Sequence, residues 1–394
     1  MCIMNPIVPA RRVGTVKEYY FSTKLREIAR LQQSGIDIVS LGVGGPDRPP
    51  HPDVTTTLQQ AATATGANGY QPYTGLPALR EAYAAWYNRY YGVTLDPDSE
   101  VLPLIGSKEG ILHITLALVN PGDAVLVPNP GYPTYTSVSR LAEADIRYYH
   151  LTEANGWEPD LDALECSDLS GVKLMWVNYP HMPTGKVANR ALFERPVAFG
   201  HRHGIVIVND NPYSFILNDK PLSLLSVDGA RDIAIELNSL SKSHNMPGWR
   251  MGMLASNATM VNWVLKVKSN IDSGQFRPMM QAAVRALQCD DTWYDELNAV
   301  YGRRRAIAEQ VMTALGCTFD PSQRGLFLWG RIADDETDAA HVADRVLNEA
   351  HVFVVPGFIF GSEGERYIRL SLCADEERLA EALRRIRALN GNRQ

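Results

Sequence analysis

Apolar residues recur at helical spacing near the start of the chain. Between Phe21 and Leu31 they follow a period of three to four residues, and Gly35 stands where a left-handed C-cap would end a helix. The pattern therefore predicts an amphipathic helix over residues 18–35, ahead of the main body of the protein.

After this helix, short apolar runs alternate with helical patterns. Runs of this length between turn residues are typical of buried strands, and helices between them are long enough for right-handed crossovers. The alternation predicts a mostly parallel sheet in an α/β protein, with helices on both faces. The predicted strands are 101–105, 124–128, 172–177, 205–209 and 233–238, and the clearest helices between them are 109–119 and 190–203.

The pattern changes past about residue 275, where long helical segments precede strands at 326–332, 352–355 and 367–372 and a final helix at 375–389. This order predicts a second, smaller α+β domain. We expect residues 1–45 to form an N-terminal arm that joins the small domain, 46–280 to form the large domain and 281–394 the small one. No linker rich in glycine, proline or serine separates them, so the domains should pack closely.

Composition excludes several classes of protein. The chain has 394 residues, a formal net charge of −6 and a sequence pI near 5.9, which gives no basic field for nucleic acid or an anionic membrane. The five cysteines are widely separated and form no CxxC, so neither a disulfide framework nor a metal site is predicted. No secretory signal or membrane span is evident, and we expect a cytoplasmic protein.

Reactive side chains follow two of the predicted strands. The strand at 205–209 runs into Asp210 and Tyr213, and the strand at 233–238 runs into a segment that carries Lys242 and Arg250. Ligands of open α/β sheets bind at the carboxyl ends of the strands. The sequence therefore predicts a site that combines a carboxylate, a phenol, a lysine and an arginine.

Several segments together resemble one family over nearly the whole chain. The chain is similar to the class I and II aminotransferases, which share the fold type I architecture of pyridoxal-phosphate (PLP) enzymes. The segments that carry the resemblance are LGVGGPD at 41–47, YQPYTGLPALREA at 70–82, GSKEG at 106–110, PNPGYPTY at 128–135, NYPHMPTG at 178–185, NDNPY at 209–213, SLSKSHNMPGWRMG at 239–252 and YIRLSL at 367–372.

The resemblance implies a catalytic centre of three residues. Lys242 matches the lysine that forms a Schiff base with the cofactor and then moves the substrate's α-proton. Asp210 matches the carboxylate that keeps the cofactor ring nitrogen protonated, so that the ring withdraws electrons. Tyr213 matches the residue that hydrogen-bonds the ring phenolate oxygen.

Further positions match residues that bind the cofactor. Phosphate needs backbone donors at a helix start together with hydroxyl and cationic side chains. The family positions are matched by Gly106, Ser107, Lys108, Ser239, Ser241 and Arg250 for the phosphate, by Tyr132 for the face of the ring, by Asn178 for the cofactor and by Tyr70 for a phosphate contact from the neighbouring subunit. The last of these implies a homodimer.

Two positions match the substrate site, and one position departs from the family. Arg369 matches the arginine that holds the substrate α-carboxylate, and Gly44 matches the glycine whose backbone approaches it. The residue before Pro-Thr-Gly is normally an asparagine that donates to the ring oxygen, but here it is Met182, which cannot donate. Asn178, His181 or water could take over that role, or the ring oxygen loses a contact and the proton affinity of the imine rises.

Other functions fit the sequence less well. Asp47 stands where a dinucleotide-binding glycine pattern needs its third glycine, and Ser107 is misplaced for the nucleophile elbow of a serine hydrolase. A PLP-dependent transcription regulator would need a DNA-binding domain ahead of the fold. A carbon–sulfur lyase of the same fold is the closest alternative, because fold and cofactor do not fix the reaction.

The predicted activity is therefore transamination. The expected substrates are an L-amino acid and a 2-oxo acid, with glutamate and 2-oxoglutarate as one pair and a Schiff base on Lys242. The identity of the preferred amino acid stays open.

Overall fold

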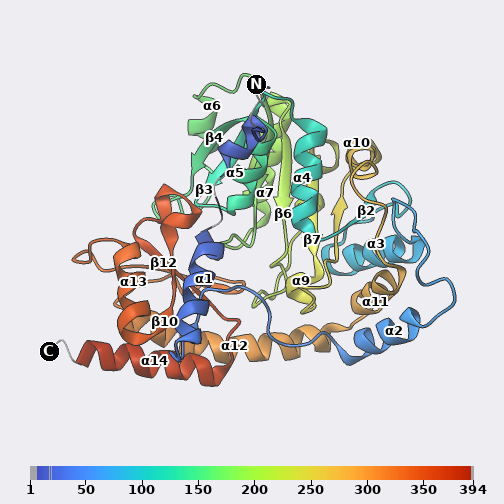
Figure 1. Ribbon diagram of the computed structural model, residues 1–394. Helices are drawn as coiled ribbons and strands as arrows, with labels where there is room; N and C mark the ends of the chain where they lie inside the picture. Colours follow the sequence, from blue (N-terminus) through green and yellow to red (C-terminus); the bar gives the residue numbers. More distant parts are fainter. Residues whose placement is uncertain (1–6, 17, 19, 392–394) are drawn as a thin grey trace, which may run out of the picture.

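The computed structural model describes residues 7–16, 18 and 20–391, and its larger part is built on a seven-stranded sheet (Figure 1). The strand order is β2 (Val101–Leu104), β8 (Gly252–Ala255), β7 (Ala234–Ser239), β6 (Val206–Asp210), β5 (Val172–Val177), β3 (Ala124–Asn129) and β4 (Asp145–His150). All neighbours pair in parallel except β8, which is antiparallel to both β2 and β7. The predicted mostly parallel sheet is confirmed.

Two strands of this sheet were not predicted, for different reasons. Strand β4 lies at the edge of the sheet and is mostly solvent-accessible, so its sequence DIRYYH lacks a continuous apolar run. Strand β8 has only four residues and follows closely on the segment that carries Lys242. An edge strand needs to pack on one side only, which explains β4. Strand β8 is fully buried, but four residues are too few to give a distinct pattern.

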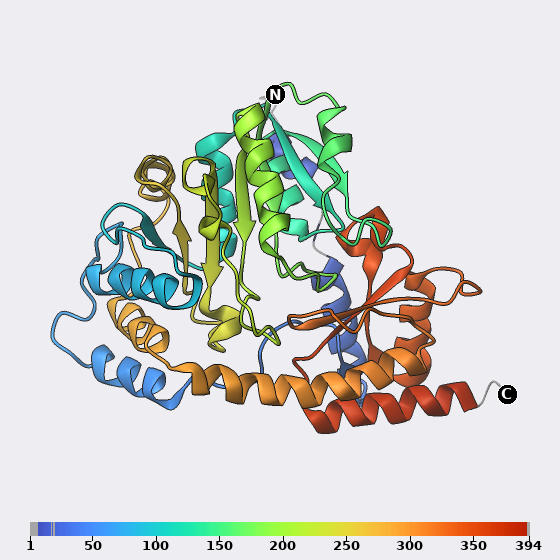
Figure 2. The same cartoon turned by 180° about the vertical axis from the view of Figure 1, so that it is seen from behind.

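Helices cover both faces of the large sheet. On one face lie α4 (Ser107–Leu118), α5 (Pro133–Leu141) and α10 (Ala258–Lys268), and α7 (Arg190–His203) lies on the opposite face (Figures 1 and 2). The helices predicted at 109–119 and 190–203 are thus present as α4 and α7. Shorter helices in this part are α6 (Leu161–Glu165), α8 (Ala230–Ile233), α9 (Leu240–Ser243) and the 3-10 turn η2 (Leu224–Ser226).

Three helices pack together at one end of the sheet: α2 (Pro52–Ala62), α3 (Pro77–Tyr91) and α11 (Arg277–Leu287). From there α12 (Asp291–Ala314) runs along the base of both parts of the molecule (Figure 2). Arg304 on this helix is buried and donates two hydrogen bonds of 2.7 Å to the carboxylate of Asp47. Helix α12 therefore ties the segment that follows β1 to the C-terminal part.

The smaller part contains an antiparallel sheet in the order β11 (Val355–Pro356), β12 (Tyr367–Ser371) and β9 (Phe327–Arg331), and a short pair of β1 (Val39–Ser40) with β10 (Val352–Phe353). The remaining elements of this part are α1 (Tyr20–Gln33), α13 (Ala339–Ala350), α14 (Glu376–Gly391) and the 3-10 turns η3 (Gly357–Phe360) and η4 (Ser362–Gly364), whereas the 3-10 turn η1 (Arg11–Thr15) packs on α5 of the larger part. The predicted second α+β unit is present.

Helix α1 and the segment that follows it pack on this smaller part. Helix α1 covers nearly the predicted range, and Gly35 has the positive φ of 85° expected of a C-cap. Lys24 forms an ion pair of 2.9 Å with Asp344, and Asp37 accepts hydrogen bonds from Arg378. These contacts place α1 and the segment after it on the smaller part, whereas Arg11 in η1 forms an ion pair of 2.6 Å with Glu143 of the larger part. The assignment of residues 1–45 to the small domain stays a prediction.

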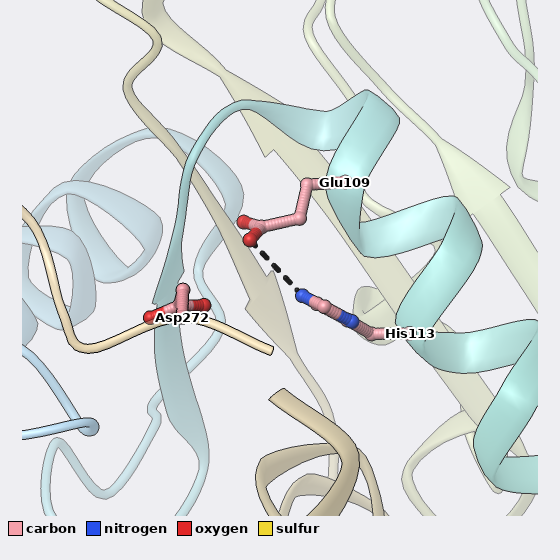
Figure 3. A group of neighbouring side chains, drawn as sticks. All are labelled: Glu109, His113 and Asp272. Carbon is pink, nitrogen blue, oxygen red and sulfur yellow. Dashed lines mark ion pairs between the residues drawn. The ribbon is translucent and has the colours of Figure 1, made fainter. Parts of the chain in front are cut away.

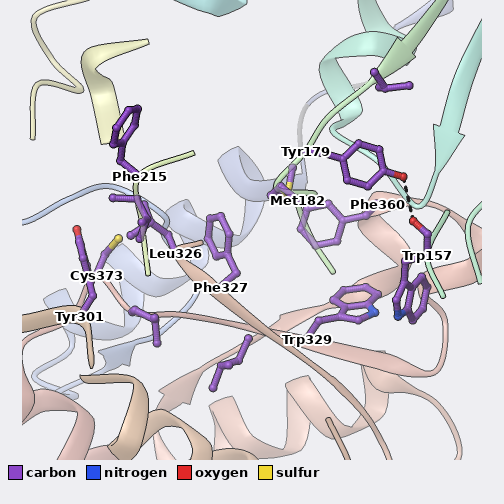
Figure 4. Packing of buried hydrophobic residues seen from close by; sticks show 14 of the residues in the cluster. Trp157, Tyr179, Met182, Phe215, Tyr301, Leu326, Phe327, Trp329, Phe360 and Cys373 are labelled. Atoms are coloured by element: carbon purple, nitrogen blue, oxygen red, sulfur yellow. Dashed lines mark hydrogen bonds between the residues drawn. The ribbon is translucent and has the colours of Figure 1, made fainter. Parts of the chain in front are cut away.

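Aromatic and sulfur side chains fill the junction between the two parts. Figure 4 shows Met182 of the larger part near Phe360 of the smaller part, with Phe327 and Trp329 on strand β9. Trp329 stacks on Tyr367 with ring centroids 4.9 Å apart. The strand ends of the large sheet face this apolar junction. Within the described ranges, none of the helices has the length and apolar character needed to cross a membrane.

Candidate active site

The carboxyl ends of the parallel strands meet around a cavity of about 600 Å³. Twelve of the fourteen residues predicted for the site line it: Gly44, Ser107, Lys108, Tyr132, Asn178, Asp210, Tyr213, Ser239, Ser241, Lys242, Arg250 and Arg369. Gly106 lies directly behind this lining. Tyr70 does not reach the cavity of its own chain and is 93% exposed on the segment between α2 and α3.

Lys242 lies on α9, which begins where β7 ends. Its Nζ donates a hydrogen bond of 2.6 Å to the backbone carbonyl of Gly44, from the segment that follows β1. Burial lowers the pKa of this ammonium, and the positive charges of Arg369 and Arg250 lower it further. The lysine is therefore closer to the neutral form that a nucleophile or base requires.

Asp210 is the last residue of β6 and is buried. Its Oδ2 accepts a hydrogen bond of 3.0 Å from the hydroxyl of Tyr135, and Oδ1 has no hydrogen-bond partner among the described residues. Burial raises the pKa of this carboxyl to about 7. A buried carboxylate oxygen without a partner is costly, so this side chain is arranged to meet a cationic or N–H group of a ligand.

A small polar cup lies at the N-terminus of α4. Ser107 is the first residue of the helix, and Gly106 before it has a φ of 76°. A Cβ atom on Gly106 would lie 2.2 Å from Nη2 of Arg250, so the guanidinium packs directly on this glycine. Ser239 donates a hydrogen bond of 2.9 Å to Oγ of Ser241 at the opposite wall. Helix amides, hydroxyls and a guanidinium together make an anion site.

Arg369 enters the cavity from β12 of the smaller part. Its Nη2 donates to the carbonyl of Gly42 at 2.8 Å, and its Nη1 lies 3.4 Å from the sulfur of Met182. The guanidinium carbon lies 4.0 Å from the ring centroid of Phe327 and 4.7 Å from that of Phe360. Aromatic faces hold this cation in place without neutralising it, which suits a group that binds a carboxylate.

Two tyrosines stand beside the cavity on opposite elements. Tyr132 caps the start of α5, and its ring meets that of Tyr135 edge to face at 5.6 Å. Tyr213 follows β6, and its ring meets that of Phe327 at 5.8 Å. Burial raises the pKa of both phenols, so each hydroxyl is a hydrogen-bond donor at neutral pH.

Met182, which stands where the family normally has asparagine, lines the cavity. Its backbone N–H donates a hydrogen bond of 2.8 Å to Oδ1 of Asn178, and the amide nitrogen of Asn178 donates to the carbonyl of Asp210. His181 contacts Thr184 at 2.8 Å, and burial lowers its pKa to about 3. Asn178 uses one of its two amide hydrogens in its contact with Asp210 and lines the cavity, whereas His181 is not among the cavity-lining residues.

Some residues of this site were missed at the level of sequence. Tyr135, which hydrogen-bonds Asp210, stands three residues after Tyr132 on α5, and that helical spacing is the signal that could have found it. Phe21 and Leu25 also line the cavity, although the sequence pattern assigned them only to the apolar face of an amphipathic helix. No sequence pattern indicates Phe327, since it lines the cavity only because β9 of the smaller part lies next to the large sheet.

Three ionisable residues lie together at the start of α4, and two of them, Glu109 and Asp272, are partly exposed (Figure 3). Glu109 binds the backbone N–H of Ile105 and lies 3.0 Å from Nε2 of His113, which is fully buried. Asp272 is near both, and its Oδ1 accepts a hydrogen bond of 2.8 Å from Lys268. The lysine supplies the positive charge, so we assign these residues to an ion-pair network that fixes the start of α4.

Known proteins share this sequence and fold. The sequence profile of the family described as aminotransferase class I and II matches residues 36–386. The chain belongs to this family. It is 40% identical over 389 residues to the LL-diaminopimelate aminotransferase of Oleidesulfovibrio alaskensis, a match that covers 98% of this chain and 100% of that protein.

Solved structures give the same result. Substrate-bound BacF from Bacillus subtilis superposes with a TM-score of 0.93 at 34% identity and covers 98% of both chains. A single mutant of Thermus thermophilus aspartate aminotransferase gives a TM-score of 0.90 at 26% identity, over 98% of this chain and 100% of that chain. The protein is therefore a fold type I, PLP-dependent aminotransferase that acts on amino acids and 2-oxo acids. These findings favour transamination over the carbon–sulfur lyase alternative.

The cavity fits PLP on two independent observations. Oδ1 of Asp210 is buried and lacks a partner, as expected of a carboxylate that receives the protonated ring nitrogen. The cup at α4 is shaped by a glycine whose missing side chain makes room for Arg250, and it offers helix amides to an anion.

Proposed function

We propose that Lys242 is the catalytic lysine of this aminotransferase and that the cavity around it holds both the cofactor and the substrate. The observation that carries the proposal is that three groups line one cavity. They are the buried carboxylate of Asp210, one oxygen of which has no hydrogen-bond partner among the described residues, the amine of Lys242 with its lowered pKa, and the guanidinium of Arg369 beside the ring of Phe327. When bound, PLP withdraws electrons from the substrate's α-carbon, which makes the α-proton removable.

Each residue of the chain then has a defined task. Lys242 would hold the cofactor, and its neutral amine would serve both as the base that takes the α-proton and as the acid that returns it. Asp210 retains the proton on the ring nitrogen, and Tyr135 orients that carboxylate. Tyr213 donates to the ring oxygen, and Tyr132 packs on the ring face.

The two ends of the cavity bind anions. We assign the cofactor phosphate to Gly106, Ser107, Lys108, Ser239, Ser241 and Arg250, and the substrate α-carboxylate to Arg369 and the backbone at Gly44. Because Arg369 comes from β12 of the smaller part and the other groups come from the large sheet, movement between the parts would change the distance between the α-carboxylate and Lys242.

We also propose a homodimer in which Tyr70 reaches the phosphate of the partner's cofactor. Tyr70 is 93% exposed, and Ile271 and Phe276 on a neighbouring segment are also exposed. The two segments lie together, since Nζ of Lys268 donates to the carbonyl of Tyr73 at 3.2 Å. Exposed apolar side chains on adjacent loops are typical of a protein interface. A cytoplasmic location and glutamate with 2-oxoglutarate as one substrate pair complete the proposal.

Replacement of the lysine tests the central assignment. Lys242→Ala should bind PLP without the absorbance of a lysine-linked imine and should lose at least about 10³-fold in single-turnover rate. An exposed lysine, Lys220→Ala, is the matched control and should leave both readouts unchanged. Retention of the imine absorbance by Lys242→Ala would contradict the proposal.

A further inference from the structure

Each cation that lines the catalytic cavity already has a role in the function proposed above. Among the described residues these cations are Lys108, Lys242, Arg250 and Arg369. In the function proposed above, Lys242 binds the cofactor, Lys108 and Arg250 belong to the phosphate cup, and Arg369 holds the α-carboxylate. The described chain therefore adds no further cation to this cavity that could meet a carboxylate on the substrate side chain.

The wall beside Arg369 is apolar instead. Phe21, Leu25 and Val43 line the cavity there, and Leu25 is 41% and Val43 44% exposed. The ring of Phe21 lies 5.5 Å from the guanidinium carbon of Arg369. A substrate whose α-carboxylate binds Arg369 would thus direct its side chain past apolar groups that are otherwise exposed to water, and burial of such groups is favourable.

A second cavity of about 660 Å³ continues along this wall and shares Phe21 and Tyr132 with the first. Its lining is rich in aromatic side chains. They are Tyr20, Phe21, Tyr132, Tyr148, Phe358 and Phe360. Phe360 also packs on Arg369 at 4.7 Å, so the same ring borders the carboxylate site and the second cavity.

The charged groups of the second cavity are peripheral or paired. Glu18 accepts a hydrogen bond of 2.8 Å from Arg26, and Nδ1 of His150 lies 2.8 Å from Glu363. Arg140, in the last turn of α5, is exposed at the margin of the cavity. An aromatic side chain would meet rings in this space, whereas among the described residues Arg140 is the cation of this lining that forms no ion pair, and it is exposed to water.

We propose that the preferred amino donor carries a large apolar side chain, with a phenyl ring as its representative, and that this side chain occupies the space between Phe21, Phe360 and the second cavity. The proposal rests on the aminotransferase function proposed above and specifies its substrate class. The proposed substrate differs from the one in the name of the Oleidesulfovibrio alaskensis relative, because LL-diaminopimelate carries a second ammonium and a second carboxylate at its far end.

The test is a half-reaction screen with the holoenzyme, in which each amino acid is added alone and the loss of cofactor imine absorbance is timed. The probes are L-phenylalanine, L-alanine, L-aspartate, L-glutamate and LL-diaminopimelate. We expect the second-order rate constant for L-phenylalanine to exceed that for L-aspartate at least about 100-fold, because a cavity of this kind penalises an unpaired carboxylate.

Two variants locate the side-chain site. Phe21→Ala should lower the ratio of the rate constants for L-phenylalanine and L-alanine about tenfold, and Phe21→Leu should lower it less, because leucine retains an apolar contact. Arg140→Ala should leave that ratio unchanged. A proportional fall for both amino acids in Phe21→Ala would overturn the assignment of Phe21 to side-chain recognition.

The remaining outcomes separate this inference from the proposed function. Faster conversion by L-aspartate than by L-phenylalanine would overturn the apolar donor. Fastest conversion by LL-diaminopimelate, lost in Arg140→Ala, would also overturn it and would identify a charged distal site. If none of the five amino acids converted the cofactor while Lys242 still formed the imine, both the apolar donor and the proposed assignment of this cavity to the substrate would fail.

Discussion

Asp210 shows how burial prepares one side chain for a ligand. Its pKa is raised to about 7 because it is buried, and only one of its two oxygens has a hydrogen-bond partner among the described residues. In the cofactor-free protein the buried carboxylate destabilises the folded state, and a cationic partner would offset this cost. Sites that must receive a charged group often carry such a cost before the group binds.

The stability of the cofactor-free protein should therefore depend on pH through Asp210. Between the ordinary pKa near 3.8 and the folded value of about 7, the folded state holds a proton that the unfolded state releases. The stabilising contribution is complete below pH 3.8 and is lost as the pH rises through 7, by at most about 4 kcal/mol. Urea unfolding at pH 5 and pH 8 should show this fall in the wild type and a smaller one in Asp210→Asn.

The same variant should lose catalytic activity, because an amide does not keep the ring nitrogen protonated. We expect at least about a 100-fold fall in single-turnover rate. The conservative variant Tyr135→Phe serves as the comparison, since it removes only the hydrogen bond to Oδ2 and should cost less. Equal rates for Asp210→Asn and the wild type would remove Asp210 from the mechanism.

Met182 is the residue at which the site departs from its family. Because a thioether cannot donate a hydrogen bond, residue 182 itself offers the ring oxygen no donor. Met182→Asn should restore a donor and lower the pH midpoint of the cofactor absorbance change by roughly one unit, the equivalent of one hydrogen bond. Met182→Leu is the matched control without a donor. Identical midpoints for the two variants would show that residue 182 does not contact the ring oxygen.

At the scale of elements, the anion cup depends on how β2 turns into α4. Gly106 makes this turn with a φ of 76°, and the guanidinium of Arg250 fills the space that a side chain would need. Glu109 accepts a hydrogen bond from the N–H of Ile105 and so fixes the turn from within the helix. The anion cup therefore depends both on the backbone conformation at Gly106 and on Arg250, which comes from a distant segment of the chain.

Gly106→Ala should damage cofactor binding more than it damages the fold. The added Cβ would lie 2.2 Å from Nη2 of Arg250 and would strain a left-handed backbone, at a cost of about 1–2 kcal/mol. We expect at least about a tenfold rise in the PLP dissociation constant, measured by fluorescence titration. Gly302→Ala is the control, because this glycine lies within α12 with open space around it, and alanine should stabilise the helix by about 0.5–1 kcal/mol.

For the whole molecule, the open question is whether two chains complete one site. Tyr70 is remote from the cavity of its own chain, whereas Lys242 lies within it. If Tyr70 serves the partner, a hybrid of a Lys242→Ala chain with a Tyr70→Ala chain contains one site with both residues intact. If it serves its own chain, no hybrid site is intact.

Mixed dimers distinguish these arrangements. Chains of the two variants, unfolded together and refolded with limiting PLP, should regain about a quarter of wild-type activity, since half of the dimers are hybrids with one intact site each. Each variant refolded alone is the control and should stay low. Recovery no greater than the mean of the two controls would exclude the contribution of Tyr70 to the partner's site.

The sequence by itself determined the elements and the reactive residue types. Apolar runs between turns predicted five strands of the large sheet and helix α7, because burial on both faces imposes a strong pattern. The motifs around Lys242 and Asp210 identified the strand ends that carry chemistry. Strand β4 gave no such pattern, since an edge strand with exposed side chains requires none.

Only the tertiary structure decided how these parts meet. The unpartnered oxygen of Asp210, the aromatic frame of Arg369 and the second cavity beside Phe21 arise from segments far apart in the chain. Packing between the large sheet and the smaller part brings those segments together, and a periodicity of two or 3.6 residues carries no information about it. The substrate class therefore follows from side-chain surroundings rather than from any motif.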